Sequence, residues 1–329
     1  MPNRHTTLTS LFTDIAGAIR SKTGDSAEIK ADDFDTAIEA IPTGGGGGEF
    51  TTEQFLGVDP VDSLTYGGTT LPEYALYRRT INNLSLPNLT KINAFALSNA
   101  NTSSDLNTLF SKLETIGDAG LANFNENINL TSDYNVVFPK LTKVSVSAFQ
   151  YFGSTTDYDS NYNDPKYNII LPSLTFPYPP YDNSTIQYFE KVRNISARNL
   201  MFETNICYSG RSLGTIDIKG WTKAPTSSSG RLTYYANNLR TLVIRNSTMC
   251  PASSNPNYMW GSDSSQAYFM TGTTNSTYNP NGEHGYIYVP DNLVSTYKND
   301  ANWQACFDVY YIKPLSEYVD PYESYYQQA

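Results

Sequence analysis

The stretch Leu86-Pro87-Asn88-Leu89-Thr90-Lys91-Ile92 decides the fold, because its spacing of apolar residues returns along the chain. Each copy carries apolar residues at its first, fourth and seventh positions. The clearest later copies are Phe110-Ser111-Lys112-Leu113-Glu114-Thr115-Ile116, Phe138-Pro139-Lys140-Leu141-Thr142-Lys143-Val144 and Phe189-Glu190-Lys191-Val192-Arg193-Asn194-Ile195. A period of roughly 20 to 50 residues is typical of a solenoid, in which each unit buries its apolar face against its neighbours.

The same spacing would also suit a set of amphipathic helices. Proline inside several copies, together with β-branched and polar neighbours, favours strands instead. Weaker echoes follow at Leu171-Pro172-Ser173-Leu174, Thr215-Ile216-Asp217-Ile218 and Thr241-Leu242-Val243-Ile244. We therefore expect an α+β chain whose body is an irregular leucine-rich-repeat-like solenoid with a β-sheet face.

The pattern divides the chain into six expected segments. These are a helical anchor at 1–42, a glycine-rich linker at 43–49, a cap or transition at 50–80, the repeat body with inserted loops at 81–284, a C-terminal cap at 285–318 and a polar tail at 319–329.

The expected anchor is a helical hairpin with apolar residues spaced three and four apart. Two helices of this length cannot bury enough apolar surface to be stable alone, so they need a partner surface. The apolar residues of the expected hairpin are Leu8, Leu11, Phe12, Ile15, Ile19, Phe34, Ile38 and Ile41.

Composition limits the classes of partner. The formal net charge is −10 and only 16% of residues are charged, so we expect no binding to nucleic acid phosphates. No uninterrupted run of 18 apolar residues occurs, and the first twenty residues lack the apolar core of a secretory signal. We expect a chain made in a cytoplasm, with no membrane insertion. Its three cysteines have no metal-site spacing, and we expect buried thiols.

Tyrosine-rich loops are the expected ligand-binding parts. Insertions in solenoids fall on surface loops, and Tyr and Pro lose little entropy on binding. The candidates are Tyr158, Tyr162, Tyr178 and Tyr181, whose rings would stack on sugar faces. Packing of these rings against the repeats is an equally good reading of each one.

The sequence offers little for catalysis. His5 and His284 lie in no cluster with an acid, and no carboxylate lies in a recognisable catalytic motif. The loop with Asp157, Asp159 and Asp164 could supply oxygen ligands to Ca²⁺, but it lacks the Gly and Glu of an EF-hand, so a solvated loop is favoured. We expect no catalytic residues, no metal and no cofactor.

Three segments resemble known protein families. Leu113-Glu114-Thr115-Ile116-Gly117-Asp118-Ala119 resembles the BspA-type leucine-rich repeat. Tyr286-Ile287-Tyr288-Val289-Pro290, with Asn302-Trp303 and Ile312-Lys313-Pro314-Leu315, is similar to the closing module of such proteins. Ile15-Ala16-Gly17-Ala18-Ile19-Arg20-Ser21-Lys22-Thr23-Gly24 resembles the N-terminal segment of tail-associated structural proteins of bacteriophages.

These resemblances imply a bacteriophage virion structural protein, a tail fibre or receptor-binding protein exposed on the particle surface. Residues 1–42 would attach to other virion proteins, and the body would bind a host cell-surface glycan or protein. Fibre proteins are often trimers, so a homo-oligomer is expected. Two alternatives stay open, a head fibre or capsid decoration protein and a polysaccharide-degrading, tailspike-like enzyme.

Overall fold

The apolar positions of the repeats share one kind of environment. In the first three copies the side chains at positions one, four and seven are all at most 3% exposed, and Leu89, Leu113 and Leu141 at the fourth position are each 0% exposed. The rings of Phe110 and Phe138 stack with centroids 5.2 Å apart. In the fourth copy Val192 and Ile195 are buried as well.

The computed structural model divides the chain into two units, Met1–Glu49 and Phe50–Ala329. It describes residues 61–125, 130–145, 147–153, 166–175, 191–204, 206–208, 210–227 and 231–327, all in the second unit. The expected anchor residues between Leu8 and Ile41 lie outside the described residues, as do the four candidate tyrosines from Tyr158 to Tyr181 and the Asp157–Asp164 loop.

Short strands at the seventh repeat position form a four-stranded parallel sheet. Its order is β2-β4-β5-β7, which is also the order of these strands in the chain. Ile92 pairs with Ile116, and Ile116 pairs with Val144, so successive copies stack in register. The strands are β2 (Thr70–Leu71), β4 (Lys91–Ile92), β5 (Thr115–Ile116) and β7 (Lys143–Val144).

The turns after these strands repeat a second, independent signature. Three residues beyond the seventh position, Phe95, Ala119 and Ser147 have φ of 55°, 50° and 55°. Left-handed backbone is uncommon in residues other than glycine. Bonds between neighbouring turns hold it here, such as Phe95 N donating to Asp118 O at 2.9 Å. Tyr74 has the same φ sign three residues after Leu71, so the segment expected as a cap at 50–80 is built like the repeats from residue 61 onward.

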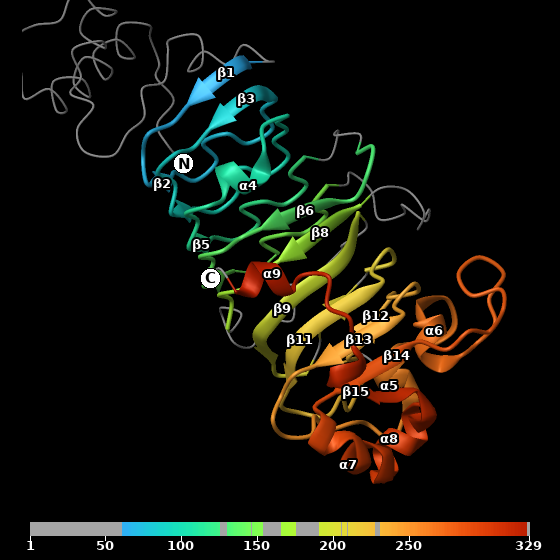
Figure 1. Ribbon diagram of the computed structural model, residues 1–329. Helices are drawn as coiled ribbons and strands as arrows, with labels where there is room; N and C mark the ends of the chain where they lie inside the picture. The colour runs from blue at the N-terminus through green and yellow to red at the C-terminus, as the bar shows by residue number, and fades with distance from the viewer. Residues whose placement is uncertain are drawn as a thin grey trace, which may run out of the picture. The chain divides into compact units, whose positions relative to one another are not determined.

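The largest sheet has seven strands in the order β15-β14-β13-β11-β9-β8-β6, and each pair runs parallel (Figure 1). One unbroken aliphatic row crosses it in register and is at most 1% exposed: Val136, Ile169, Ile195, Ile216, Leu242, Ile287 and Ile312. The strands are β6 (Tyr134–Val137), β8 (Tyr167–Ile170), β9 (Val192–Phe202), β11 (Thr215–Trp221), β13 (Thr241–Ile244), β14 (Tyr286–Val289) and β15 (Ile312–Pro314).

The opposite face of this sheet, which we call the polar face, carries the alternate residues of the strands. Asn168 Nδ2 donates to Asn135 Oδ1, and Asn194 Nδ2 donates to Asn168 Oδ1, each at 2.8 Å. These amides form a ladder across β6, β8 and β9. Ser196 and Asp217 continue the polar face on β9 and β11 and are at most 1% exposed.

A C-terminal arm, residues 318–327, covers the polar face, and α9 (Glu323–Tyr326) lies across β8 and β9 (Figure 1). The Tyr326 hydroxyl lies 3.0 Å from Ser196 Oγ, and Asn135 Nδ2 donates to the Tyr325 hydroxyl at 3.3 Å. The sequence had assigned no role to this polar segment. Its docking depends on ion pairs and tyrosines, which leave no hydrophobic periodicity to read.

The residues expected to close the chain form a strand, two short helices and a final strand. Trp303 and Tyr297 are 0% exposed, and the Trp303 indole N–H donates to Cys250 O at 2.9 Å. Cys250 and Cys306 are free and buried. The elements after β13 are α5 (Pro256–Trp260), η2 (Asp263–Ser265), α6 (Tyr268–Thr271), η3 (Asp291–Leu293), α7 (Val294–Asn299), α8 (Ala301–Cys306), η4 (Val309–Tyr311) and η5 (Leu315–Glu317).

The remaining elements are small. β1 (Val61–Thr65) pairs with β3 (Ile81–Ser85), β10 (Cys207–Tyr208) pairs with β12 (Thr233–Tyr234), and α4 (Leu106–Leu109) precedes the second copy of the repeat.

Candidate functional site

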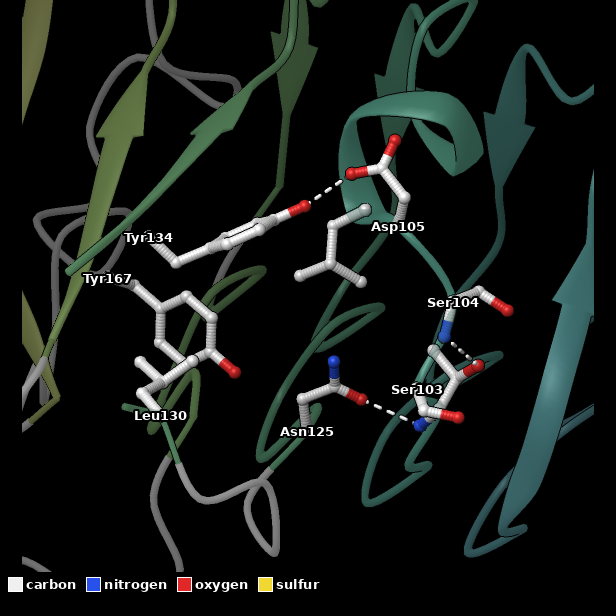
Figure 2. Close-up of a pocket in the computed structure, with 9 residues that line it drawn as sticks. Ser103, Ser104, Asp105, Asn125, Leu130, Tyr134 and Tyr167 are labelled. Carbon is white, nitrogen blue, oxygen red and sulfur yellow. Dashed lines mark hydrogen bonds between the residues drawn. The ribbon is translucent and has the colours of Figure 1, made fainter. Parts of the chain in front are cut away.

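A pocket of about 360 Å³ opens beside α4 and the first residues of β6 and β8 (Figure 2). Two tyrosines, one carboxylate, one amide and several hydroxyls line it. The lining residues are Thr102, Ser103, Ser104, Asp105, Leu106, Asn125, Leu130, Tyr134 and Tyr167. A concave site with a few convergent polar groups is the default candidate for ligand binding.

The segment before α4 forms one wall, and hydrogen bonds to neighbouring turns fix it. Thr102 N donates to the buried Asn125 Oδ1 at 2.8 Å, and Ser104 N donates to Thr102 Oγ1 at 3.1 Å. Ser104 Oγ accepts a bond of 2.7 Å from Leu84 N on β3. This wall is therefore preorganised by the repeat stack.

Tyr134 and Tyr167 form the opposite wall. They pair in register at the start of β6 and β8, and their ring centroids lie 6.2 Å apart with the planes at 83°. Figure 2 shows the Tyr134 hydroxyl pointing at Asp105, to which it donates a hydrogen bond, while the Tyr167 hydroxyl points toward Asn125. Sheet register thus sets the spacing of the two rings.

Protonation in the pocket follows from burial and these bonds. Burial, strengthened for Tyr134 by the bond to Asp105, raises the pKa of both Tyr134 and Tyr167 to about 12. Hydrogen bonds from Thr108 and Tyr134 hold the pKa of Asp105 below its usual value. At neutral pH the pocket therefore holds two neutral phenols and one charged carboxylate.

Asp105 acts as a helix cap. Its Oδ2 accepts from Thr108 N at 3.0 Å and from Thr108 Oγ1 at 2.6 Å, and its Oδ1 accepts from Tyr134. Glycoside hydrolysis usually needs two carboxylates flanking the bond to be cleaved. Asp105 is the one carboxylate among the nine described lining residues.

The sequence did not single out any of these lining residues. Tyr134 and Tyr167 begin strands whose alternation looks ordinary, and only the parallel pairing of β6 with β8 brings their rings together. The segment Ser104-Asp105 before Leu106 and Leu109 is the signal that could have located this wall, because Asp and Ser are preferred helix caps.

A second group of aromatic residues lies at the other edge of the seven-stranded sheet. Tyr286 and Tyr310 are 40% and 68% exposed. The half-buried His284 ring stacks on Tyr311 with centroids 4.4 Å apart. Tyr288 packs on Tyr318 of the C-terminal arm.

Two kinds of site are absent from the described part of the chain. Within it, no group of three or more His, Cys, Asp or Glu side chains could hold a metal ion. No helix among the same residues has both the length and the apolar character needed to span a bilayer.

No protein-family model, curated protein or solved structure matches this chain.

Proposed function

We propose that the chain is a bacteriophage virion structural protein of the tail fibre or receptor-binding kind, which attaches through residues 1–42 and presents its body to a host-surface glycan. The resemblance of the N-terminal segment to phage tail-associated proteins supports the first half. The stacked parallel strands, with copies of the repeat in register, support a BspA-like leucine-rich-repeat solenoid as the display body.

The pocket of Figure 2 is the observation that carries the adhesion role. Sugars present hydroxyl groups and apolar C–H faces, and proteins bind them with aromatic rings and neutral hydrogen-bonding groups. Tyr134 and Tyr167 supply the rings, while Ser103, Ser104 and Asn125 supply hydroxyl and amide groups. The Tyr134 hydroxyl donates to Asp105, and this bond fixes the direction of the Tyr134 ring in the pocket.

The test is a bacterial glycan array probed with the full chain and with two variants. Tyr134→Phe removes the pocket hydroxyl and should weaken binding to the preferred glycan by about tenfold, since one hydrogen bond contributes about 0.5–1.5 kcal/mol and more beside a charge. Tyr77→Phe, a half-buried tyrosine outside the pocket, is the matched control and should leave binding unchanged.

Binding to no glycan on the array, or equal binding by both variants, would remove the pocket from the proposal. Release of reducing ends from a bound polysaccharide would instead favour the degrading enzyme. Gold-labelled antibody on intact particles separates the tail from the head, because label on the capsid fits a head fibre or decoration protein.

A further inference from the structure

A second pocket, of about 380 Å³, lies between the insertion that follows β13 and helix α8. One side comes from α5 and α6 and the other from the end of α8 and the residues after it. Its lining is Pro256, Asn257, Gln266, Met270, Thr271, Gln304, Ala305, Cys306, Phe307 and Asp308. We call this pocket the amide cup, because three of its side chains are amides.

The two sides of the amide cup are fixed to each other. Trp260, at the end of α5, is 0% exposed, and its indole N–H donates to Cys306 O at 2.7 Å. Its ring lies 5.9 Å from the ring of Phe307. α5 and α8 lie side by side at this end of the sheet (Figure 1). A ligand that enters the cup therefore meets walls that need little ordering.

The polar groups of the cup have hydrogen-bonding capacity to spare. The side-chain amides of Asn257 and Gln266 make no hydrogen bond to any residue that the structure describes. Gln304 uses its Nε2 to donate to Lys298 O at 2.8 Å, which leaves its Oε1 as an acceptor. Asp308 accepts from Tyr310 N through Oδ1, so Oδ2 is available to a donor.

The charge and the apolar lining narrow the class of ligand. Asp308 is the one charged residue among the ten described lining residues, so the cup disfavours carboxylates and phosphates. Ala305 is exposed and Phe307 is 5% exposed, so Ala305 and the edge of Phe307 provide an apolar contact beside the amides, while Met270 is 0% exposed and lies behind them. An acetamido group matches this lining. Its N–H needs an acceptor, its carbonyl needs donors and its methyl group needs an apolar contact.

We propose that the amide cup binds a 2-acetamido-2-deoxyhexose, such as N-acetylglucosamine, as a unit of a larger glycan. The acetamido N–H donates to Asp308, its carbonyl accepts from both Asn257 and Gln266, and its methyl group contacts Ala305 and the edge of Phe307. Gln304 Oε1 accepts from a ring hydroxyl. The site is separate from the pocket of Figure 2 and does not depend on the role proposed for that pocket.

The test is saturation-transfer NMR on the full chain, with N-acetylglucosamine, glucose and glucuronate as separate probes. We expect a signal for N-acetylglucosamine, strongest at its methyl group, and none for the other two sugars. Asn257→Ala and Gln266→Ala should each weaken binding about three- to tenfold, the usual cost of one lost hydrogen bond. Asn292→Ala changes an exposed asparagine outside the cup and should bind like the parent chain.

Asp308→Asn gives a further readout, because asparagine still caps the following turn while the carboxylate is lost. It should weaken binding of N-acetylglucosamine and let glucuronate compete. Equal signals from glucose and N-acetylglucosamine would overturn the proposal, as would unchanged binding in both alanine variants. It would also be overturned if N-acetylglucosamine gave no signal at about 10 mM, roughly tenfold above a millimolar Kd. Tyr134→Phe should not affect binding of N-acetylglucosamine to the amide cup. A negative glycan-array test of the Figure 2 pocket can therefore be distinguished from a failure of the amide-cup proposal.

Discussion

Replacing Asp320 by alanine should release the C-terminal arm from the polar face. Asp320 Oδ2 accepts from Arg245 Nη2 at 2.6 Å and also pairs with Arg198. Both arginines also face Asp217, whose side chain is 1% exposed and which accepts a bidentate pair from Arg245 at 2.6 and 2.8 Å. A third carboxylate, Glu323 of α9, accepts from Arg198 Nη1 at 2.7 Å. The arm thus contributes two of the three carboxylates that neutralise two largely buried guanidinium groups.

The magnitude follows from these contacts. A hydrogen bond to a charged group contributes about 1.5–3 kcal/mol, so the two bonds to Asp320 give about 3–6 kcal/mol. In the variant Asp217 still faces both arginines and Glu323 still pairs with Arg198. The Asp320 side chain is 10% exposed, so water can also replace part of the loss. We expect the free energy of opening the arm to fall by about 2–3 kcal/mol, near the lower limit for breaking a buried pair.

Hydrogen exchange followed by mass spectrometry measures this opening directly. In Asp320→Ala, amides of α9 should exchange roughly 30- to 150-fold faster, because each 1.4 kcal/mol is a factor of ten. Strands β11 and β13 should keep their protection, since their aliphatic row is unchanged. The matched control is Glu317→Ala, an exposed acid just before the arm, which should change exchange little.

Equal exchange of α9 in Asp320→Ala and Glu317→Ala would refute this reasoning. So would loss of protection across the whole seven-stranded sheet, because the arm would then support the fold and not merely cover one face.

Three further predictions test the repeats, the pocket and the anchor. Leu113→Ala should lower the free energy of unfolding by about 2–5 kcal/mol in urea titration, because the side chain is 0% exposed and leaves a cavity; a loss under about 1 kcal/mol would contradict the stacked core. Tyr134 and Tyr167 should ionise near pH 12, which is measured as tyrosinate absorbance. Their contribution to the stability of the fold is therefore full below pH 10.0 and is lost as the pH rises to about 12. Ionisation at the ordinary value of 10.0 would contradict their burial. Deleting residues 1–42 should leave a folded body that no longer enters virus particles, and normal incorporation would refute the anchor.

Much of the repeat body could be predicted from the sequence, because each copy has the same local spacing of apolar residues. The residues at the first, fourth and seventh positions are buried wherever the structure describes them, and the segment expected as a C-terminal cap begins with strand β14. The sequence could not show that the fourth copy belongs to another sheet, where Ile195 pairs with Ile169 and Ile216. Apolar spacing reports which side chains are buried but not which strands they pair with.

The candidate site was less predictable. Tyr134 and Asp105 come from different repeats and meet only through the stacking of those repeats. The polar face also escaped prediction, because Asn168 and Asp217 look like solvent-facing strand residues until the C-terminal arm covers them. Ion-pair partners far apart in sequence produce no periodic pattern. The pairing of Arg198 with Asp320 could therefore not be predicted from the sequence.

The course of the C-terminal arm determines where a fusion partner attached at its end would lie. After β15, at one edge of the seven-stranded sheet, the chain runs back so that Tyr325 reaches Asn135 on β6, at the other edge. A fluorescent reporter or affinity tag fused after Gln327 would leave the body over β6, β8 and β9. Such a fusion needs a spacer, because without one its bulk would press on the strands that carry Tyr134 and Tyr167.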